Sequence, residues 1–112
     1  MSTMTSLNKE ADIKKVLSKG KRIKGDGLSA AFIVNGLGVT RIAIPVKKTM
    51  GNAVARNRMR RRLKEAVRAA IKGLGTRPRT DIVIFPSLTT KNEGFIVLCQ
   101  KVRAMFASAG II

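Results

Sequence analysis

The middle of the chain reads KKTMGNAVARNRMRRRLKE over residues 47–65. An apolar stripe recurs at helical spacing through this stretch and beyond it, at Met59, Leu63, Ala66, Ala70 and Leu74. This period predicts a long helix from about Asn52 to about Leu74, which Gly73 and Gly75 would end.

The predicted helix is basic on the side opposite its apolar stripe. Seven of the 13 residues from Arg56 to Arg68 are basic and six of them are Arg, whereas the chain has no Asp or Glu between Asp26 and Glu65. Like charges one turn apart destabilise an isolated helix, so an anionic partner explains this face better than solvent does. The face consists of Asn57, Arg58, Arg61, Lys64, Arg68 and Lys72. Arg56 and Arg60 fall on the apolar side, and we expect their stems to reach outward from the helix start.

The entry of this helix carries further groups that suit phosphate. Gly51 and Asn52 lead into the helix, whose first backbone N–H groups are free to bind an anion. Lys47 and Lys48 flank the same end. Arg adds a planar fork that matches phosphate oxygens and can stack on bases. The stretch therefore predicts a nucleic-acid-binding surface.

Composition supports this prediction and excludes other functions. The 112 residues include 23 Lys and Arg against six Asp and Glu, giving a net charge of +17, and 45% of the chain is hydrophobic. A folded domain with so much unbalanced charge fits a polyanionic partner. The absence of His excludes a Ser-His-Asp triad and a zinc site of Cys and His. We therefore assign no catalytic and no metal-binding residue to this chain.

The single cysteine and the lack of long apolar runs indicate the cellular compartment. Cys99 cannot form an internal disulfide, which is typical of a reducing compartment. No apolar run approaches the roughly 18 residues of a membrane helix, and the polar first residues do not resemble a secretory signal. We expect a cytoplasmic protein of one domain, residues 1–112, with residues 1–7 flexible and no membrane partner.

Elements on both sides of the basic helix predict an α+β fold. Asn8 can cap a first helix that Gly20 ends. Residues 28–34 and 39–46 read as a strand and its returning partner, joined by the turn Asn35-Gly36-Leu37-Gly38, with Pro45 at an edge or at the strand's end. Residues 81–85 read as a buried strand. The order helix, strand pair, long basic helix, strand, helix predicts a small two-layer sandwich.

The last helix has both a start signal and a core stripe. Thr90 and Glu93 have the spacing of a capping box. The stripe that follows predicts a helix packed on the core, and its members are Phe95, Leu98, Cys99, Val102, Met105 and Phe106.

The stretch Gly51-Asn52-Ala53-Val54-x-Arg56-Asn57-Arg58-x-Arg60-Arg61 resembles the signature of the bacterial ribonuclease P protein component. The resemblance extends, thinly, to Ile13-Lys14-Lys15-Val16-Leu17-x-Lys19-Gly20 and to Asp81-Ile82-Val83-Ile84. It implies a left-handed βαβ crossover around the long helix, as in the second domain of a small-subunit ribosomal protein. Base rates for parallel strands favour the right-handed form, so this expectation comes from the resemblance alone.

The resemblance also implies a function. The family's enzyme is a ribonucleoprotein endonuclease that removes the 5′ leader from precursor tRNA, with catalysis and Mg²⁺ ions in its RNA subunit. Its protein subunit binds that RNA and the single-stranded leader, and raises the affinity for substrate and metal. The RNA-binding residues so implied are Lys47, Lys48, Asn52, Arg56, Asn57, Arg58, Arg60, Arg61, Arg62, Lys64 and Arg68.

The expected leader cleft, between the first helix and the sheet, differs from the family's pattern. Ile13 and Leu17 stand where relatives often have aromatic residues. Stacking of a base on an aromatic ring contributes roughly 1–3 kcal/mol. We therefore take Phe32, with Ile13 and Leu17, as the leader-cleft candidates. The six acids form no two-metal motif, which agrees with catalysis in another subunit.

Other functions predict different features. A different RNA-binding protein on a similar α+β fold, such as a ribosomal protein, predicts ribosome association and no effect on leader removal. A DNA-binding module would need a helix-turn-helix or a dimer signature, and the sequence has neither. A membrane-surface helix would carry large aromatic residues on its apolar face, which this helix lacks.

Overall fold

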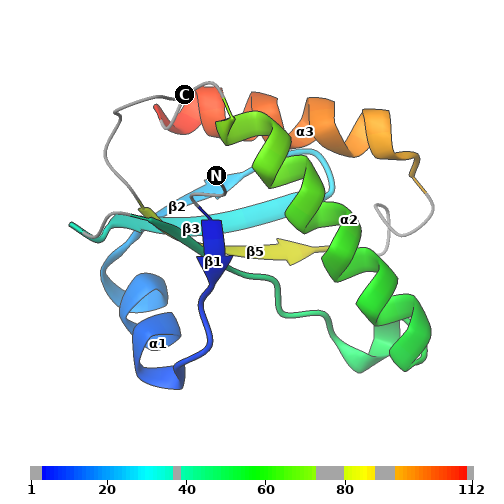
Figure 1. The fold of residues 1–112 in the computed structure, drawn as a ribbon, viewed down its shortest axis with the longest axis horizontal. Helices are drawn as coiled ribbons and strands as arrows, with labels where there is room; N and C mark the ends of the chain where they lie inside the picture. The colour runs from blue at the N-terminus through cyan, green and yellow to red at the C-terminus, as the bar shows by residue number, and fades with distance from the viewer. Residues whose placement is uncertain (1–3, 37–38, 73–79, 88–92, 111–112) are drawn as a thin grey trace.

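The computed structural model describes residues 4–36, 39–72, 80–87 and 93–110. Within them it contains one five-stranded sheet, three α-helices and a short 3-10 helix, which confirms the α+β class (Figure 1). In chain order the elements are β1 (Met4–Ser6), α1 (Glu10–Lys19), β2 (Lys21–Lys24), β3 (Leu28–Val34), β4 (Thr40–Ala43), η1 (Lys48–Met50), α2 (Ala53–Ile71), β5 (Thr80–Pro86) and α3 (Phe95–Ala109).

The strand order is β1-β4-β5-β3-β2. The predicted pairing of residues 28–34 with 39–46 is wrong, because β5 lies between β3 and β4. Strand β5 is antiparallel to β3 and parallel to β4, so α2 is the crossover between two parallel strands. A continuous buried apolar run, Ile82-Val83-Ile84, suits this central place. The hand of the crossover stays a prediction.

Helices cover both faces of the sheet (Figure 1). One face packs against α2 and α3, through a core that includes Ile42, Ile82, Leu63, Val102 and Phe106. The other face packs against α1 through a smaller core of Leu7, Val16, Ala31, Ala43 and Val83. The stripe predicted on α2 is confirmed for Met59, Leu63, Ala66 and Ala70, while Leu74, Gly73 and Gly75 lie outside the described residues.

The segment of residues 1–7, which we expected to be flexible, contains a strand in its described part, and its flexibility stays a prediction. Residues 4–6 form β1, which pairs in parallel with β4 in the register Met4↔Thr40. Burial of Met4 and Leu7 accounts for this order, since both side chains are over nine-tenths buried. Asn8 is not the cap of the first helix, because the N-cap position belongs to Lys9, whose side chain makes no capping bond.

Three other boundaries differ from expectation. Strand β2 was not predicted, because its sequence Lys-Arg-Ile-Lys is too polar to read as a strand. Strand β4 ends at Ala43, so Pro45 follows the strand rather than interrupting it. Helix α3 begins at Phe95 with Gly94 as its N-cap, and Thr90, the other half of the predicted capping box, lies outside the described residues, as do Leu37 and Gly38.

A buried ion pair ties α1 and the strands together on the α1 face. The Arg41 guanidinium donates from Nη2 to Asp81 Oδ2 at 2.6 Å and from Nε to Asp81 Oδ1 at 2.8 Å. It also reaches Asp12 of α1 at 3.3 Å, while Asn35 donates to Asp81 Oδ1 at 2.7 Å. Burial alone would raise the pKa of Asp81, but the hydrogen bonds from Arg41 and Asn35 outweigh it and hold that pKa below its usual value.

Replacing Asp81 by Asn should lower the free energy of unfolding by about 3 kcal/mol, because it leaves a half-buried guanidinium without its main partner. Urea titrations at pH 7 would measure this loss. The pKa of Asp81 is lower in the folded than in the unfolded state. The stabilisation that the ionised Asp81 supplies is therefore complete above the unfolded pKa, near 3.8. That contribution disappears as the pH falls through the folded value.

The difference in stability between the native chain and Asp81→Asn should therefore shrink below pH 4. Asp26→Asn is the matched control, because this carboxylate is 88% exposed and should cost little. Equal losses for the two variants, or a pH-independent difference, would show that the Asp81 pair does not hold the fold.

Candidate nucleic-acid interface

The basic helix α2 begins at a defined turn and cap. After η1 the chain turns at Gly51, whose φ of 129° is a conformation that favours glycine. Asn52 is the N-cap, and its Oδ1 accepts a hydrogen bond from the Ala55 N–H at 2.9 Å. Lys47 and Lys48 are exposed just before this end. The structure thus brings the predicted cations and the helix N-terminus together.

The predicted basic face is exposed along α2. Asn57, Arg58, Arg61, Arg68 and Lys72 lie in solvent, and Lys64 is half-buried with its Nζ donating to Ser6 Oγ at 3.3 Å. A shallow groove of about 310 Å³ runs over the helix and is lined by Asn57, Arg60, Arg61, Lys64, Glu65 and Arg68. The face therefore offers both charge and a surface indentation to a phosphate backbone.

Arg56, Arg60 and Arg62 are half-buried rather than extended into solvent. Arg60 donates from Nε to the Ile44 carbonyl at 3.2 Å and from Nη1 to Asn57 Oδ1 at 3.0 Å. Arg62 donates to the Glu93 carbonyl at 3.3 Å. Arg56 has a buried Nε without a hydrogen-bond partner among the described residues. The expectation that Arg60 reaches outward is wrong, because its guanidinium bonds the carbonyl that follows β4.

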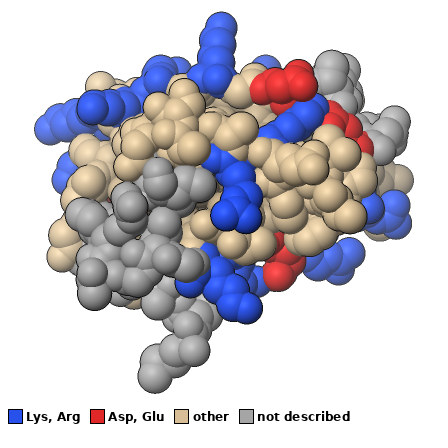
Figure 2. All heavy atoms as spheres, turned by 90° about the horizontal axis from the view of Figure 1, so that it is seen from above, with Lys and Arg blue, Asp and Glu red and all other residues tan. Residues whose placement is uncertain are grey.

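All six acids of the chain are paired with cations. Glu10 pairs with Lys14, Glu65 with Arg68, Asp12 and Asp81 with Arg41, and Asp26 and Glu93 with Lys101. Arg58, Arg61 and Lys72 consequently have no acidic partner within the described part of the chain. In Figure 2, blue Lys and Arg side chains project around the molecule and red acids occupy few places.

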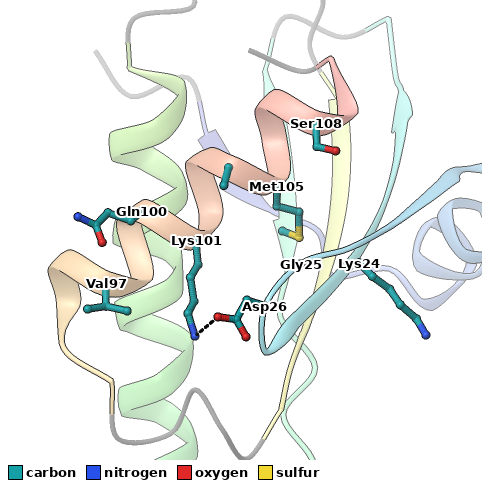
Figure 3. Close-up of a pocket in the computed structure, with 9 residues that line it drawn as sticks. Lys24, Gly25, Asp26, Val97, Gln100, Lys101, Met105 and Ser108 are labelled. Atoms are coloured by element: carbon teal, nitrogen blue, oxygen red, sulfur yellow. Dashed lines mark ion pairs between the residues drawn. The ribbon is translucent and has the colours of Figure 1, made fainter.

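The cavity between the β2–β3 turn and α3 differs from the α2 face, because its Lys101 is paired with acids (Figure 3). It measures about 420 Å³, and Lys101 points from α3 toward Asp26 with Nζ 3.4 Å from Asp26 Oδ2. The hydrogen bond to Glu93, aided by Asp26, raises the pKa of Lys101 against the effect of burial. Since its central cation is already neutralised, this cavity is poorly suited to a polyanion.

The structure does not bring the three predicted leader-cleft residues together. Ile13 and Leu17 pack against the smaller core on the α1 face. Phe32 packs against the larger core on the opposite face, because it alternates with Ala31 and Ile33 along β3. The aromatic residue on the α1 face is Phe85 of β5, which is half-buried there. The sequence alone shows that Phe85 lies on the same side of its strand as Asp81 and Val83. Which face of the sheet that side forms depends on the strand order, which the sequence pattern did not reveal.

A second basic groove, of about 730 Å³, opens beside Phe85. Register places Ser29 opposite Phe85 and Lys24 opposite Ser29, so all three lie on the α1 face. Arg22, Lys24 and Lys47 supply cations to its lining, and Arg22 Nη2 also donates to the Leu17 carbonyl at the end of α1. The groove combines an aromatic ring with cations, which is the combination that binds single-stranded nucleic acid.

Among the described residues no three His, Cys, Asp or Glu side chains gather in a way that could hold a metal ion. Of the described helices, none has the length and apolar character needed to cross a membrane.

Comparisons with known proteins agree on one family. A family model described as Ribonuclease P matches residues 1–110. The ribonuclease P protein component of Gluconacetobacter diazotrophicus is 34% identical over 110 residues, covering 94% of this chain and 90% of the relative. That of Clostridioides difficile is 35% identical over 89 residues, covering 80% and 77%.

Solved structures show the same fold. The RNase P protein of Staphylococcus aureus superposes with a TM-score of 0.73 at 21% identity, covering 97% of this chain and 96% of its own. The RNase P protein of Thermotoga maritima also gives 0.73, at 24% identity, covering 87% and 90%.

Replacing Asn52 by Ala should lower the free energy of unfolding by about 1 kcal/mol, because the Ala55 N–H loses its capping oxygen. Asn52→Asp should keep most of the stability, since a carboxylate also caps and suits the helix dipole. Thermal and urea unfolding would measure both variants. A loss as large for Asn52→Asp as for Asn52→Ala would contradict the capping role.

Proposed function

The chain belongs to the ribonuclease P protein component family, and we propose that it is the protein subunit that binds the RNA subunit of ribonuclease P and the 5′ leader of precursor tRNA. The observation that supports this best is the exposed α2 face, where Arg58 and Arg61 have no acidic partner within the described residues. Such side chains gain most from a polyanion, because contact with phosphates releases the counterions around the RNA.

The α2 face is held rigid by the arginines beside it. Arg60 anchors α2 to the backbone after β4, and Arg62 anchors it to the backbone before α3. Asn52 caps its start, where Lys47 and Lys48 add charge. We assign Arg58, Arg61, Arg68 and Lys72 to direct phosphate contact. Asn52, Arg60 and Arg62 support this face by holding the helix in place.

We assign the catalytic groups and Mg²⁺ to the RNA subunit. A protein nuclease needs carboxylates or imidazoles that are free to bind metal or move protons. Here each acid is paired with a Lys or Arg, and the chain contains no His. These residues do not fit a metal site. When bound to the RNA, Mg²⁺ would activate the attacking water, and this chain would contribute by neutralising phosphates around that site.

The groove beside Phe85 is our candidate for the leader. A single strand entering it would stack a base on Phe85 while Arg22, Lys24 and Lys47 contact its phosphates. Ile13 and Leu17 contribute apolar packing from α1 on the same face. Phe85 thus takes the place that we had given to Phe32. Lys47 belongs both to this groove and to the start of the α2 face, so one RNA-binding surface continues into the other.

Reconstitution tests the proposed function. The chain, mixed with a bacterial ribonuclease P RNA at Mg²⁺ too low for the RNA alone, should produce cleavage of precursor tRNA at the mature 5′ end. Arg61→Ala should raise the protein concentration needed for half-maximal cleavage roughly tenfold, because one charge-assisted contact is lost. Cleavage would be followed on labelled precursor tRNA.

Lys14→Ala provides the control for that experiment, since Lys14 is an exposed cation on α1 that pairs with Glu10. It should leave half-maximal cleavage unchanged. Absence of stimulation by the folded protein with several bacterial RNAs would refute the proposed function. Equal effects of the two variants would refute the assignment of the α2 face.

The groove assignment predicts a leader-specific defect. Phe85→Leu keeps apolar bulk but removes the ring, so the reconstituted enzyme should bind precursor tRNA about fivefold or more weakly. Its affinity for mature tRNA, which lacks the leader, should not change. Phe32→Leu makes the same chemical change on the opposite face of the sheet and should not weaken leader binding. A leader-specific loss in Phe32→Leu, and none in Phe85→Leu, would reverse the assignment.

A further inference from the structure

The first turn of α3 exposes large apolar side chains. Phe95 and Ile96 are 42% and 73% exposed, although the α3 stripe predicts Phe95 in the core. The later stripe residues Leu98, Val102, Met105 and Phe106 are buried, so the difference is confined to the helix start. Neighbouring large apolar side chains that stay exposed together can mark a binding surface.

This apolar turn adjoins the basic helix. Arg62 of α2 donates from Nη1 to the carbonyl of Glu93, two residues before Phe95. Helical spacing puts Phe95 on the same side of α3 as Cys99 and Phe106, which pack against the core that α2 covers. Phe95 therefore lies where α3 meets α2, near Arg62 in the middle of α2.

Phe95 is partly exposed close to positive charge. Gly94 has no side chain, and a Cβ built there meets nothing within 4 Å. Glu93, two residues before Phe95, is paired with Lys101 and so does not offset the charge of Arg62. An occupant of this corner must combine an apolar planar group with negative charge.

We propose that Phe95, with Ile96, is a stacking platform for an unpaired base of the RNA that lies along α2. The proposal rests on the proposed RNA-binding function and extends it beyond the α2 face onto α3. A nucleotide has both required parts, a planar base for the ring and a phosphate for Arg58, one helical turn before Arg62 on α2. A second copy of this chain fits less well, because it would bring another +17 charge to the same corner.

Fluorescence can test the platform directly, because the chain contains no Trp and no Tyr. Phe95→Trp places the protein's single indole on the platform, and titration with a bacterial ribonuclease P RNA should quench its emission. Val34→Trp is the matched control, since Val34 is also largely exposed, at 59%, but lies at the end of β3. We expect quenching at position 95 to exceed that at position 34 severalfold.

Affinity and salt dependence supply a second readout. Phe95→Ala should weaken RNA binding about 5- to 20-fold without changing the slope of log affinity against log salt, because stacking releases no counterion. Arg58→Gln should instead reduce that slope by about one. Circular dichroism would confirm that each variant is folded.

Three results would overturn the platform while RNA binding persists. They are equal quenching of the indole emission in Phe95→Trp and Val34→Trp, native affinity in Phe95→Ala, and a changed salt slope in Phe95→Ala. If the unaltered chain shows no RNA binding by fluorescence anisotropy of labelled RNA, the proposed function itself fails, and the platform fails with it.

Discussion

The allocation of six acids among 23 basic residues governs this structure. Asp81 and Asp12 hold Arg41 between two strands and α1, and Glu93 and Asp26 hold Lys101 between α3 and the β2–β3 turn. Asp81, Asp12 and Asp26 pair with cations of other elements, and the buried Asp81 needs its partner most, because a buried charge without one is costly. All six acids are thus neutralised by Lys or Arg side chains of the same chain. The surplus of positive charge on α2 remains available to an outside anion, so the side chains that stabilise the domain differ from those that we propose to bind RNA.

Local patterns were sufficient to predict α2 and its basic face. The 3.6-residue period requires only neighbouring residues, and Met59, Leu63, Ala66 and Ala70 are buried as that period predicts. Arg58, Arg61 and Arg68 are exposed for the same reason. Arg60 and Arg62 were predicted less well, because their hydrogen-bond partners, the carbonyls of Ile44 and Glu93, come from segments that the helical period does not describe.

Topology was the part that local patterns could not supply. Strands β3 and β4 are neighbours in sequence, but β5 separates them because it carries the most fully buried run and takes the centre of the sheet. This order decides which face each alternate residue occupies. Phe32 consequently faces α2 and α3 while Phe85 faces α1, the reverse of what the expected cleft required. The terminal strand β1 escaped prediction for a related reason, since three residues carry no periodicity and are ordered by pairing with β4.

The four phenylalanines of the chain differ in burial and in the face of the fold on which they lie. Phe106 is fully buried, and Phe32 is half-buried on the sheet face that α2 and α3 cover. Phe85 is half-buried in the groove that Lys47 also lines, and Phe95 is 42% exposed, two residues after the carbonyl that accepts from Arg62. With Ile13 and Leu17 on α1, the chain has no aromatic side chain on its first helix and no Tyr or Trp to compensate. Stacking requires a planar face near a phosphate-binding cation, and Phe85 of β5 and Phe95 of α3 are our two candidates for that role. Under these proposals, charge along α2 and the rings of Phe85 and Phe95 would hold an RNA strand together.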